Sequence, residues 1–165
     1  MNVEVLQRAK NGLQIEDVYQ VLSASHLAEG FDPKLDTRVN QLDLQLKHIV
    51  RRSYLIETQQ EDKAVLFFRV EIILGARFVF NNKDEQSEDK VNLVAQIEAT
   101  YMADYRITDM QLRTDNEALD CFAVNNASYH VWPYWREFVS NQAQRMNLPK
   151  VILPVMQLAA NRAQN

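Results

Sequence analysis

The side chains that most often carry out chemistry are few in this sequence, and their spacing does not suit catalysis. The three histidines and the single cysteine stand far apart, without the His-x-x-x-His or paired-cysteine spacing of a zinc site. No Gly-x-Ser-x-Gly motif marks an activated serine, and the three glycines do not cluster into a phosphate-binding loop. We therefore predict that the protein is not an enzyme, and we expect no catalytic residue, no metal and no cofactor.

A group of aromatic residues is the better candidate for function. Trp132, Tyr134, Trp135 and Phe138 fall within a few positions of one another. They cannot all face the same side of a helix, and aromatic side chains bury large areas against varied partners. Each also has a plainer interpretation as a core or subunit-interface residue. The group indicates binding through apolar surface rather than catalysis.

The bulk composition limits the kinds of partner. The chain has 165 residues, of which 47% are hydrophobic, enough for one domain with a sizeable core. Its net charge of −4 argues against a broad basic surface, so we expect no nucleic acid as partner. The wholly apolar runs are short, and we expect no membrane insertion. A single cysteine and the lack of a secretory signal pattern fit a cytoplasmic protein.

Three long alternating segments dominate the middle of the chain. Apolar residues occupy the even positions of 66–80, the odd positions of 91–105 and, apart from His48 and Arg52, the even positions of 42–56. A period of two with one apolar face is typical of half-buried antiparallel strands. The polar breaks at 59–63 and 81–90 are short, which also favours antiparallel neighbours.

The N-terminal side of these strands predicts three further elements. Residues 3–10 have the pattern of a short helix, and residues 15–27 that of a first strand. Residues 29–38 contain Gly30 and Pro33 and predict a loop. The predicted strands are long, so either Gly75 marks a bend or bulge or the sheet is large.

The C-terminal side changes to helical spacing. Residues 115–146 predict helix, in which Pro133 starts a second helix or kinks one long helix. Residues 151–158 are apolar and contain Pro154, so we expect an extended segment, with 159–165 as a flexible tail. Strands first and helices last is the α+β order.

The helical part of the sequence resembles the SecB family of chaperones. The run 131–139, Val-Trp-Pro-Tyr-Trp-Arg-Glu-Phe-Val, is followed by Leu148-Pro149 and then by Leu153-Pro154-Val155. It is similar to the Pro-Tyr-x-Arg-Glu helix, Phe-Pro turn and Leu-x-Pro-Val segment of that family. The strong similarity covers about residues 118–158, and the strands match by pattern alone.

The resemblance implies a fold and a function. It implies a four-stranded antiparallel sheet with C-terminal helices packed on one face, as a single domain over 1–165 with 1–14 as an N-terminal extension. SecB-like proteins assemble as homotetramers, dimers of dimers, and hold unfolded preproteins without ATP for the export motor SecA. The function to expect is therefore that of an ATP-independent holdase in protein export.

The resemblance also selects candidate site residues. In the family, client segments lie in apolar grooves formed in part by the helix and by the loop after the first strand. Phe31 and Leu35 fall in that loop, although both also suit local anchoring of the loop. Glu98 matches an acidic residue of the surface that docks SecA. The candidate client contacts are Phe31, Leu35, Trp132, Tyr134, Trp135, Leu148, Val151, Leu153, Val155 and Met156.

Departures from the family pattern keep other functions open. The first strand has Leu22 and His26 where the family's docking surface is acidic, and Met146-Asn147 replace a glycine before the Phe-Pro turn. The family's long last helix and acidic tail have no counterpart. A divergent SecB-like chaperone dedicated to one client, such as an antitoxin of a toxin–antitoxin system, is the alternative. A ligand carrier or enzyme built on the same elements is a third.

Overall fold

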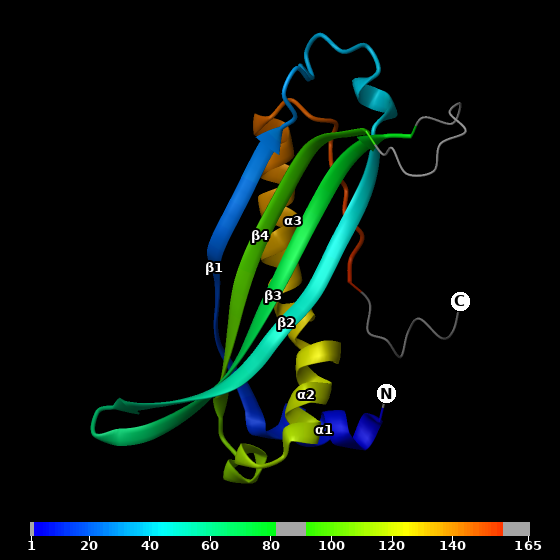
Figure 1. Ribbon diagram of the computed structural model, residues 1–165. Helices are drawn as coiled ribbons and strands as arrows, with labels where there is room; N and C mark the ends of the chain where they lie inside the picture. Colours follow the sequence, from blue (N-terminus) through cyan, green and yellow to red (C-terminus); the bar gives the residue numbers. More distant parts are fainter. Residues whose placement is uncertain (1, 82–91, 157–165) are drawn as a thin grey trace.

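A four-stranded antiparallel sheet forms the frame of the molecule (Figure 1). The computed structural model describes residues 2–81 and 92–156. The strands are β1 (Leu13–Leu27), β2 (Asp43–Gln60), β3 (Lys63–Phe80) and β4 (Asn92–Ile107), in the spatial order β1-β4-β3-β2. The predicted α+β class is confirmed, and so are the four strands. The tail predicted at 159–165 lies outside the described residues.

The loop 28–42 crosses one end of the sheet, because β1 and β2 are its opposite edges (Figure 1). It includes the short 3₁₀ helix η1 (Val39–Gln41). Arg38 lies over the ring of Phe80, 4.4 Å from its centroid, and fixes the loop to the end of β3. The predicted loop at 29–38 is therefore confirmed.

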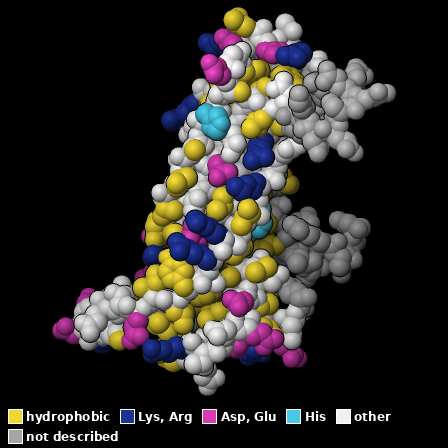
Figure 2. Space-filling view, viewed as in Figure 1, with side chains coloured by type: hydrophobic (Ala, Val, Ile, Leu, Met, Phe, Trp, Pro, Cys, Tyr) yellow, Lys and Arg dark blue, Asp and Glu magenta, His cyan; other side chains and the backbone are white. Residues whose placement is uncertain are grey.

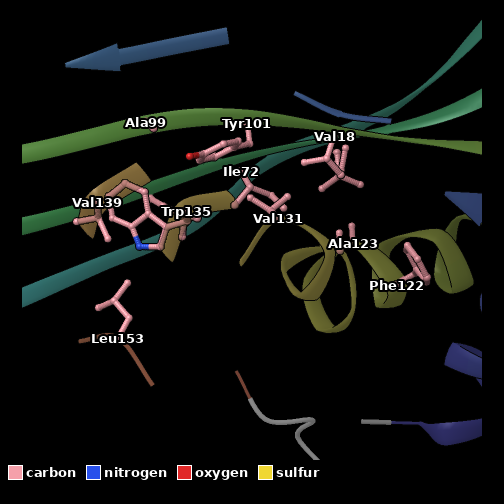
Figure 3. Packing of buried hydrophobic residues seen from close by; sticks show 14 of the residues in the cluster. Val18, Ile72, Ala99, Tyr101, Phe122, Ala123, Val131, Trp135, Val139 and Leu153 are labelled. Carbon is pink, nitrogen blue, oxygen red and sulfur yellow. The ribbon is translucent and has the colours of Figure 1, made fainter. Parts of the chain in front are cut away.

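The longer C-terminal helix covers part of one face of the sheet. The helices are α1 (Val3–Gly12), α2 (Asn116–Asn125) and α3 (Ala127–Arg145), with the 3₁₀ helix η2 (Met110–Arg113) before α2. An inward stripe of α3 at helical spacing, Val131, Trp135, Val139 and Ala143, is buried against β3 and β4 (Figure 3). Within 2–81 and 92–156, no helix has the length and apolar character to cross a membrane.

The break between the two C-terminal helices lies at Asn126, and the prediction of a second helix starting at Pro133 was wrong. Pro133 lies inside α3. The side chain of Asn125 donates a hydrogen bond to the carbonyl oxygen of Cys121 (2.8 Å), and the backbone of Asn126 leaves the helical region at φ −125°. Asparagine side chains compete for backbone groups in this way and favour helix ends.

The end of α3 explains one departure from the SecB pattern. Asn147 has a φ of +54°, the left-handed conformation that a glycine usually supplies after a helix. The Leu148 amide then donates to the Ala143 carbonyl (2.9 Å), and the Asn147 amide to that of Gln144 (3.2 Å). These two bonds form a Schellman motif, in which Asn147 takes the position that a glycine usually occupies.

A β-bulge divides β2 into two parts. The ladder with β3 is regular up to Val50 and resumes at Arg52, which leaves Arg51 as an extra residue. One extra residue reverses the faces of all residues beyond it. Leu46 therefore lies on the side of α3 and Tyr54 on the opposite side. The prediction that the even positions of this strand share one face throughout was wrong.

Of the two alternatives that the sequence left open, a bulge at Gly75 or a large sheet, the structure has the large sheet without a bulge at Gly75. It pairs in register with Lys47 on one side and Glu98 on the other. A Cβ atom at Gly75 would lie 3.3 Å from the Cβ of Lys47, tighter than ordinary contact. The missing side chain lets the Lys47 ammonium reach Glu98 across β3 (3.1 Å).

The N-terminal extension packs as part of the domain. Val5, Leu6 and Ala9 of α1 are buried, and α1 packs on α2. Arg8 forms an ion pair with Asp115 at the start of α2 (2.9 Å). A Cβ atom at Gly12 would lie 2.6 Å from the Leu112 side chain, so the close contact with η2 needs glycine.

The bulge in β2 contacts Glu71 of β3, the one charged side chain that is buried within residues 2–81 and 92–156. Glu71 is 3% exposed and accepts hydrogen bonds from Arg51 (2.9 Å) and from Arg52. Burial alone would raise the pKa of this carboxyl, but the hydrogen bonds and charges of the two arginines together hold it below its ordinary value of 4.5. Its contribution to stability is therefore present above that value and is lost as the pH falls through the lowered pKa.

We expect Glu71→Gln to lower the free energy of unfolding at neutral pH by about 1–2 kcal/mol, because one charged acceptor is lost from the two arginines. The variant should also lose less stability than the wild type between neutral and acid pH. Urea unfolding at several pH values measures both effects. The matched control is Glu57→Gln, whose pair with Arg113 is exposed on both sides and should change stability by less than about 0.5 kcal/mol.

Candidate functional site

The face of the sheet opposite α3 carries a series of ion pairs among apolar side chains (Figure 2). Arg69 and Asp104 form a bidentate pair across β3 and β4, with both distances 2.7 Å. Arg106 pairs in the same way with Glu16 of β1, and this hydrogen bond holds the pKa of the Glu16 carboxyl below its usual range. Each of these four charges has a partner within the subunit, which reduces the charge that they offer to a partner protein.

Glu98, the candidate for docking SecA, lies on this open face. Its carboxylate accepts hydrogen bonds from Lys47 (3.1 Å) and from Gln96 (3.3 Å). A basic partner would have to displace Lys47 to reach it. Docking through Glu98 stays a prediction, and the geometry makes that residue less available than the sequence suggested.

The other face is only partly covered, because α3 lies over β4 and β3. Leu44 and Leu46 of β2 point to the same side as α3, since Leu46 pairs with the core residue Ala76. His48, two positions further along, bonds Ser128 of α3 (2.6 Å). Leu44 is nevertheless 37% exposed and Leu46 49% exposed. We call these two leucines the β2 strip.

The outer edge of β2 adds backbone groups to this apolar surface. β2 is the last strand of the sheet, and no described strand pairs with its outer side. Proteins usually protect such edges with outward charges, above all lysine. The nearest lysine, Lys47, is instead held over the sheet by Glu98. An extended chain could therefore pair with this edge while its side chains contact the β2 strip.

The segment 148–156 lies beside α3 in an extended conformation, as the sequence predicted (Figure 1). Its alternate residues Val151 and Leu153 are buried, whereas Ile152 and Val155 are 75% and 70% exposed. The Trp132 indole Nε1 donates to the Pro154 carbonyl oxygen (2.9 Å) and holds the segment to α3. The segment therefore presents a second row of exposed apolar side chains.

Comparison with solved structures finds a protein of similar fold. No protein-family model matches the chain, and no curated protein matches it. The structure is described as the Mycobacterium tuberculosis Rv1957 SecB-like chaperone in complex with a ChAD peptide from the Rv1956 HigA1 antitoxin. The two chains are 17% identical, the match covers 93% of this chain and 97% of that one, and the TM-score is 0.63. This chain has a SecB-like fold. The resemblance inferred from sequence is confirmed at the level of the fold.

The SecB-like fold places the candidate client contacts in three environments. Trp135, Leu148, Val151 and Leu153 are buried in the core and cannot contact another chain in this conformation. Trp132, Phe31 and Met156 are half-buried. Leu35, Tyr134 and Val155 are exposed. The set is therefore not one continuous surface.

The two candidates in the crossing loop differ from each other. Phe31 packs edge-to-face on Phe80, with ring centroids 6.2 Å apart, which is the anchoring role that the sequence left open for it. Leu35 is 78% exposed and contributes nothing to the core. Of the two, Leu35 is the residue that a client could reach.

Leu44, Leu46 and Ile152 were missed as surface residues. The alternation of β2 identified the two leucines as apolar, but it assigned them to a buried face because edge position is not encoded in that pattern. Ile152 was missed because inward and outward positions in 148–156 depend on the hydrogen bond from Trp132.

The residues able to bind a metal are scattered in the structure as well. Within 2–81 and 92–156, no three His, Cys, Asp or Glu side chains come together at a possible metal site. Cys121 is a half-buried free thiol on α2. We find no arrangement of nucleophile and base in these ranges that resembles a catalytic site.

We expect Leu153→Ala to release the segment 148–156 and to lower the free energy of unfolding by about 2 kcal/mol, because a buried side chain leaves a cavity. Urea unfolding measures the loss, and limited proteolysis should then cut near residue 153. The neighbouring Ile152→Ala removes a 75% exposed side chain and should change stability by less than about 0.5 kcal/mol. Equal effects of the two variants would contradict the placement of the segment.

Proposed function

We propose that this protein is an ATP-independent chaperone that binds unfolded polypeptides along the outer edge of β2. The observation that carries the proposal is the combination of an unpaired edge with the exposed β2 strip. Backbone hydrogen bonds to the edge would be independent of the client's sequence, while leucines accept many apolar side chains. This combination suits a partner that is defined by being unfolded rather than by one motif.

The proposal needs no bound nucleotide or metal. Affinity comes from apolar area removed from water, at about 25 cal/mol per Å² before the cost of ordering the client. Because those ordering costs are large, binding should be reversible and the client should be able to leave by itself. We accordingly infer a binding protein rather than an enzyme.

We expect the wild-type protein to suppress aggregation of a chemically unfolded client without nucleotide, and the double variant Leu44→Ser/Leu46→Ser to bind that client roughly tenfold more weakly. Both leucines are at least one-third exposed, so the fold should survive. Light scattering measures aggregation, and fluorescence anisotropy of a labelled, permanently unfolded polypeptide measures affinity.

The matched control is Met110→Ser/Val124→Ser, which removes two apolar side chains that are 57% and 63% exposed near α2. This variant should bind the client like the wild type. If both double variants lost the same affinity for the client, any exposed apolar surface would be able to bind it, and the assignment of the site to β2 would be contradicted. No suppression by the wild type at several-fold molar excess would contradict chaperone function itself.

A dedicated partner is the second candidate function. The solved structure with the same fold holds a peptide of an antitoxin, which supports a chaperone that serves one client. Pull-down from the native cell distinguishes the two functions, because one stoichiometric partner favours the dedicated chaperone and many preproteins favour the general one. Delivery to SecA, a homotetrameric assembly and a cytoplasmic location are expectations from the SecB resemblance.

A further inference from the structure

A cavity at the end of the sheet where β1 begins has no role in the proposed chaperone function. It has a volume of about 190 Å³ and lies where α1, the start of β1, the end of β4, α2 and α3 meet. Tyr105 pairs with Phe68 of β3, whereas Leu46 pairs with Ala76, so the cavity lies towards the other end of the sheet from the β2 strip (Figure 1). Its existence depends on the N-terminal helix, which contributes Lys10 to its lining.

The inner part of the cavity is aromatic and aliphatic. The rings of Tyr105 and Phe122 meet edge-to-face, with centroids 4.9 Å apart, and Leu13 and Ile15 add aliphatic surface. Such a surface binds flat apolar groups by area and by ring stacking. An apolar cavity of about 150 Å³ holds a benzene ring in other proteins, so this one has room for a ring with a small substituent.

The polar part of the cavity is made of hydrogen-bond donors. The Tyr105 hydroxyl and His130 Nδ1 are 2.9 Å apart. Burial raises the pKa of Tyr105, so its hydroxyl keeps its proton and is able to donate to Nδ1. Burial, followed by the charge of Lys10, lowers the pKa of His130, so the ring is neutral near pH 7. In the tautomer that accepts from Tyr105 the proton is on Nε2, where the ring can donate to a ligand.

The charges around the cavity are of one sign. Lys10 and Asn126 line the cavity together with His130, and no described residue that lines it is acidic. A carboxylate placed there would accept hydrogen bonds from His130 and Lys10 without meeting a negative charge. Donors at one side and aromatic surface at the other define an amphiphilic ligand.

We propose that this cavity binds a small carboxylate with a flat apolar body, of about the size of benzoate. The carboxylate lies against Lys10 and His130, and the apolar body lies against Tyr105 and Phe122. Binding ties α1 to the core of the domain, since Lys10 and the other residues come from different elements. The proposal is independent of client binding at β2.

Titration with benzoate, followed by NMR of the histidine imidazole signals, tests this proposal. We expect a saturable shift of the His130 signals, while those of His26 and His48 stay unchanged and serve as internal controls. Benzamide has the same shape without the charge and should bind at least about tenfold more weakly. The proposal would be overturned if the His130 signals showed no saturable shift up to about 10 mM benzoate, since weaker binding than that has little significance. Equal binding of benzamide would also overturn it.

Two pairs of variants locate the site. Lys10→Met keeps the aliphatic stem and should weaken benzoate binding about tenfold, whereas Lys34→Met, in the crossing loop, should not. Ile15→Trp should fill the cavity and abolish binding, whereas Val21→Trp, at a similarly exposed position of the same strand, should leave it intact. Benzoate binding that survives Ile15→Trp, or that Lys34→Met weakens as much as Lys10→Met, would place the ligand elsewhere and overturn the proposal.

Discussion

The width of a single α-helix, about 10 Å with its side chains, sets how much of this sheet can be covered. Neighbouring strands lie about 4.8 Å apart, so four strands with their side chains are roughly twice as wide as one helix. α3 packs over β4 and β3, and the extended segment 148–156 occupies further space beside it. Of the two edge strands, α3 also reaches β1 but makes little contact with β2, whose leucines remain exposed on the covered side.

The same constraint explains the contrast between the two faces. On the open face no helix excludes water, and ion pairs such as Arg69–Asp104 link neighbouring strands there. On the partly covered face the side chains are apolar, and those that α3 cannot reach are available to another chain. The exposed apolar surface is thus a consequence of the incomplete covering of the sheet by α3, and no additional binding segment is needed to form it.

Much of the fold could be predicted from the sequence, because period-two alternation over long segments specifies antiparallel strands directly. The boundary between α2 and α3 was harder to predict from the sequence. Pro133 is the stronger breaker by type, yet the chain breaks at Asn126, where side-chain hydrogen bonding competes with the helix. The role of Asn147 could not be predicted either, because only its backbone angle φ, known from the structure, shows that it adopts the left-handed conformation usual for glycine.

The site was predicted less well, for a physical reason. Hydrophobicity and resemblance identify apolar residues, but they do not tell which of them a neighbouring element covers. Trp135 and Leu153 are covered and are core residues, whereas Leu46, which looks the same in the alternating pattern, lies at an edge. A bulge that reverses the faces of β2 after Val50 has no signature in the pattern either.

Hydrogen–deuterium exchange of the backbone amides, with and without a permanently unfolded polypeptide, tests the central claim most directly. If a client pairs with the free edge of the sheet, amides in the first half of β2, residues 43–50, should exchange more slowly when the polypeptide is bound. The amides of β4, which are already paired on both sides, should change little. Protection confined to the open-face residues of β1 and β4, or no protection in β2 at saturating client, would contradict this account.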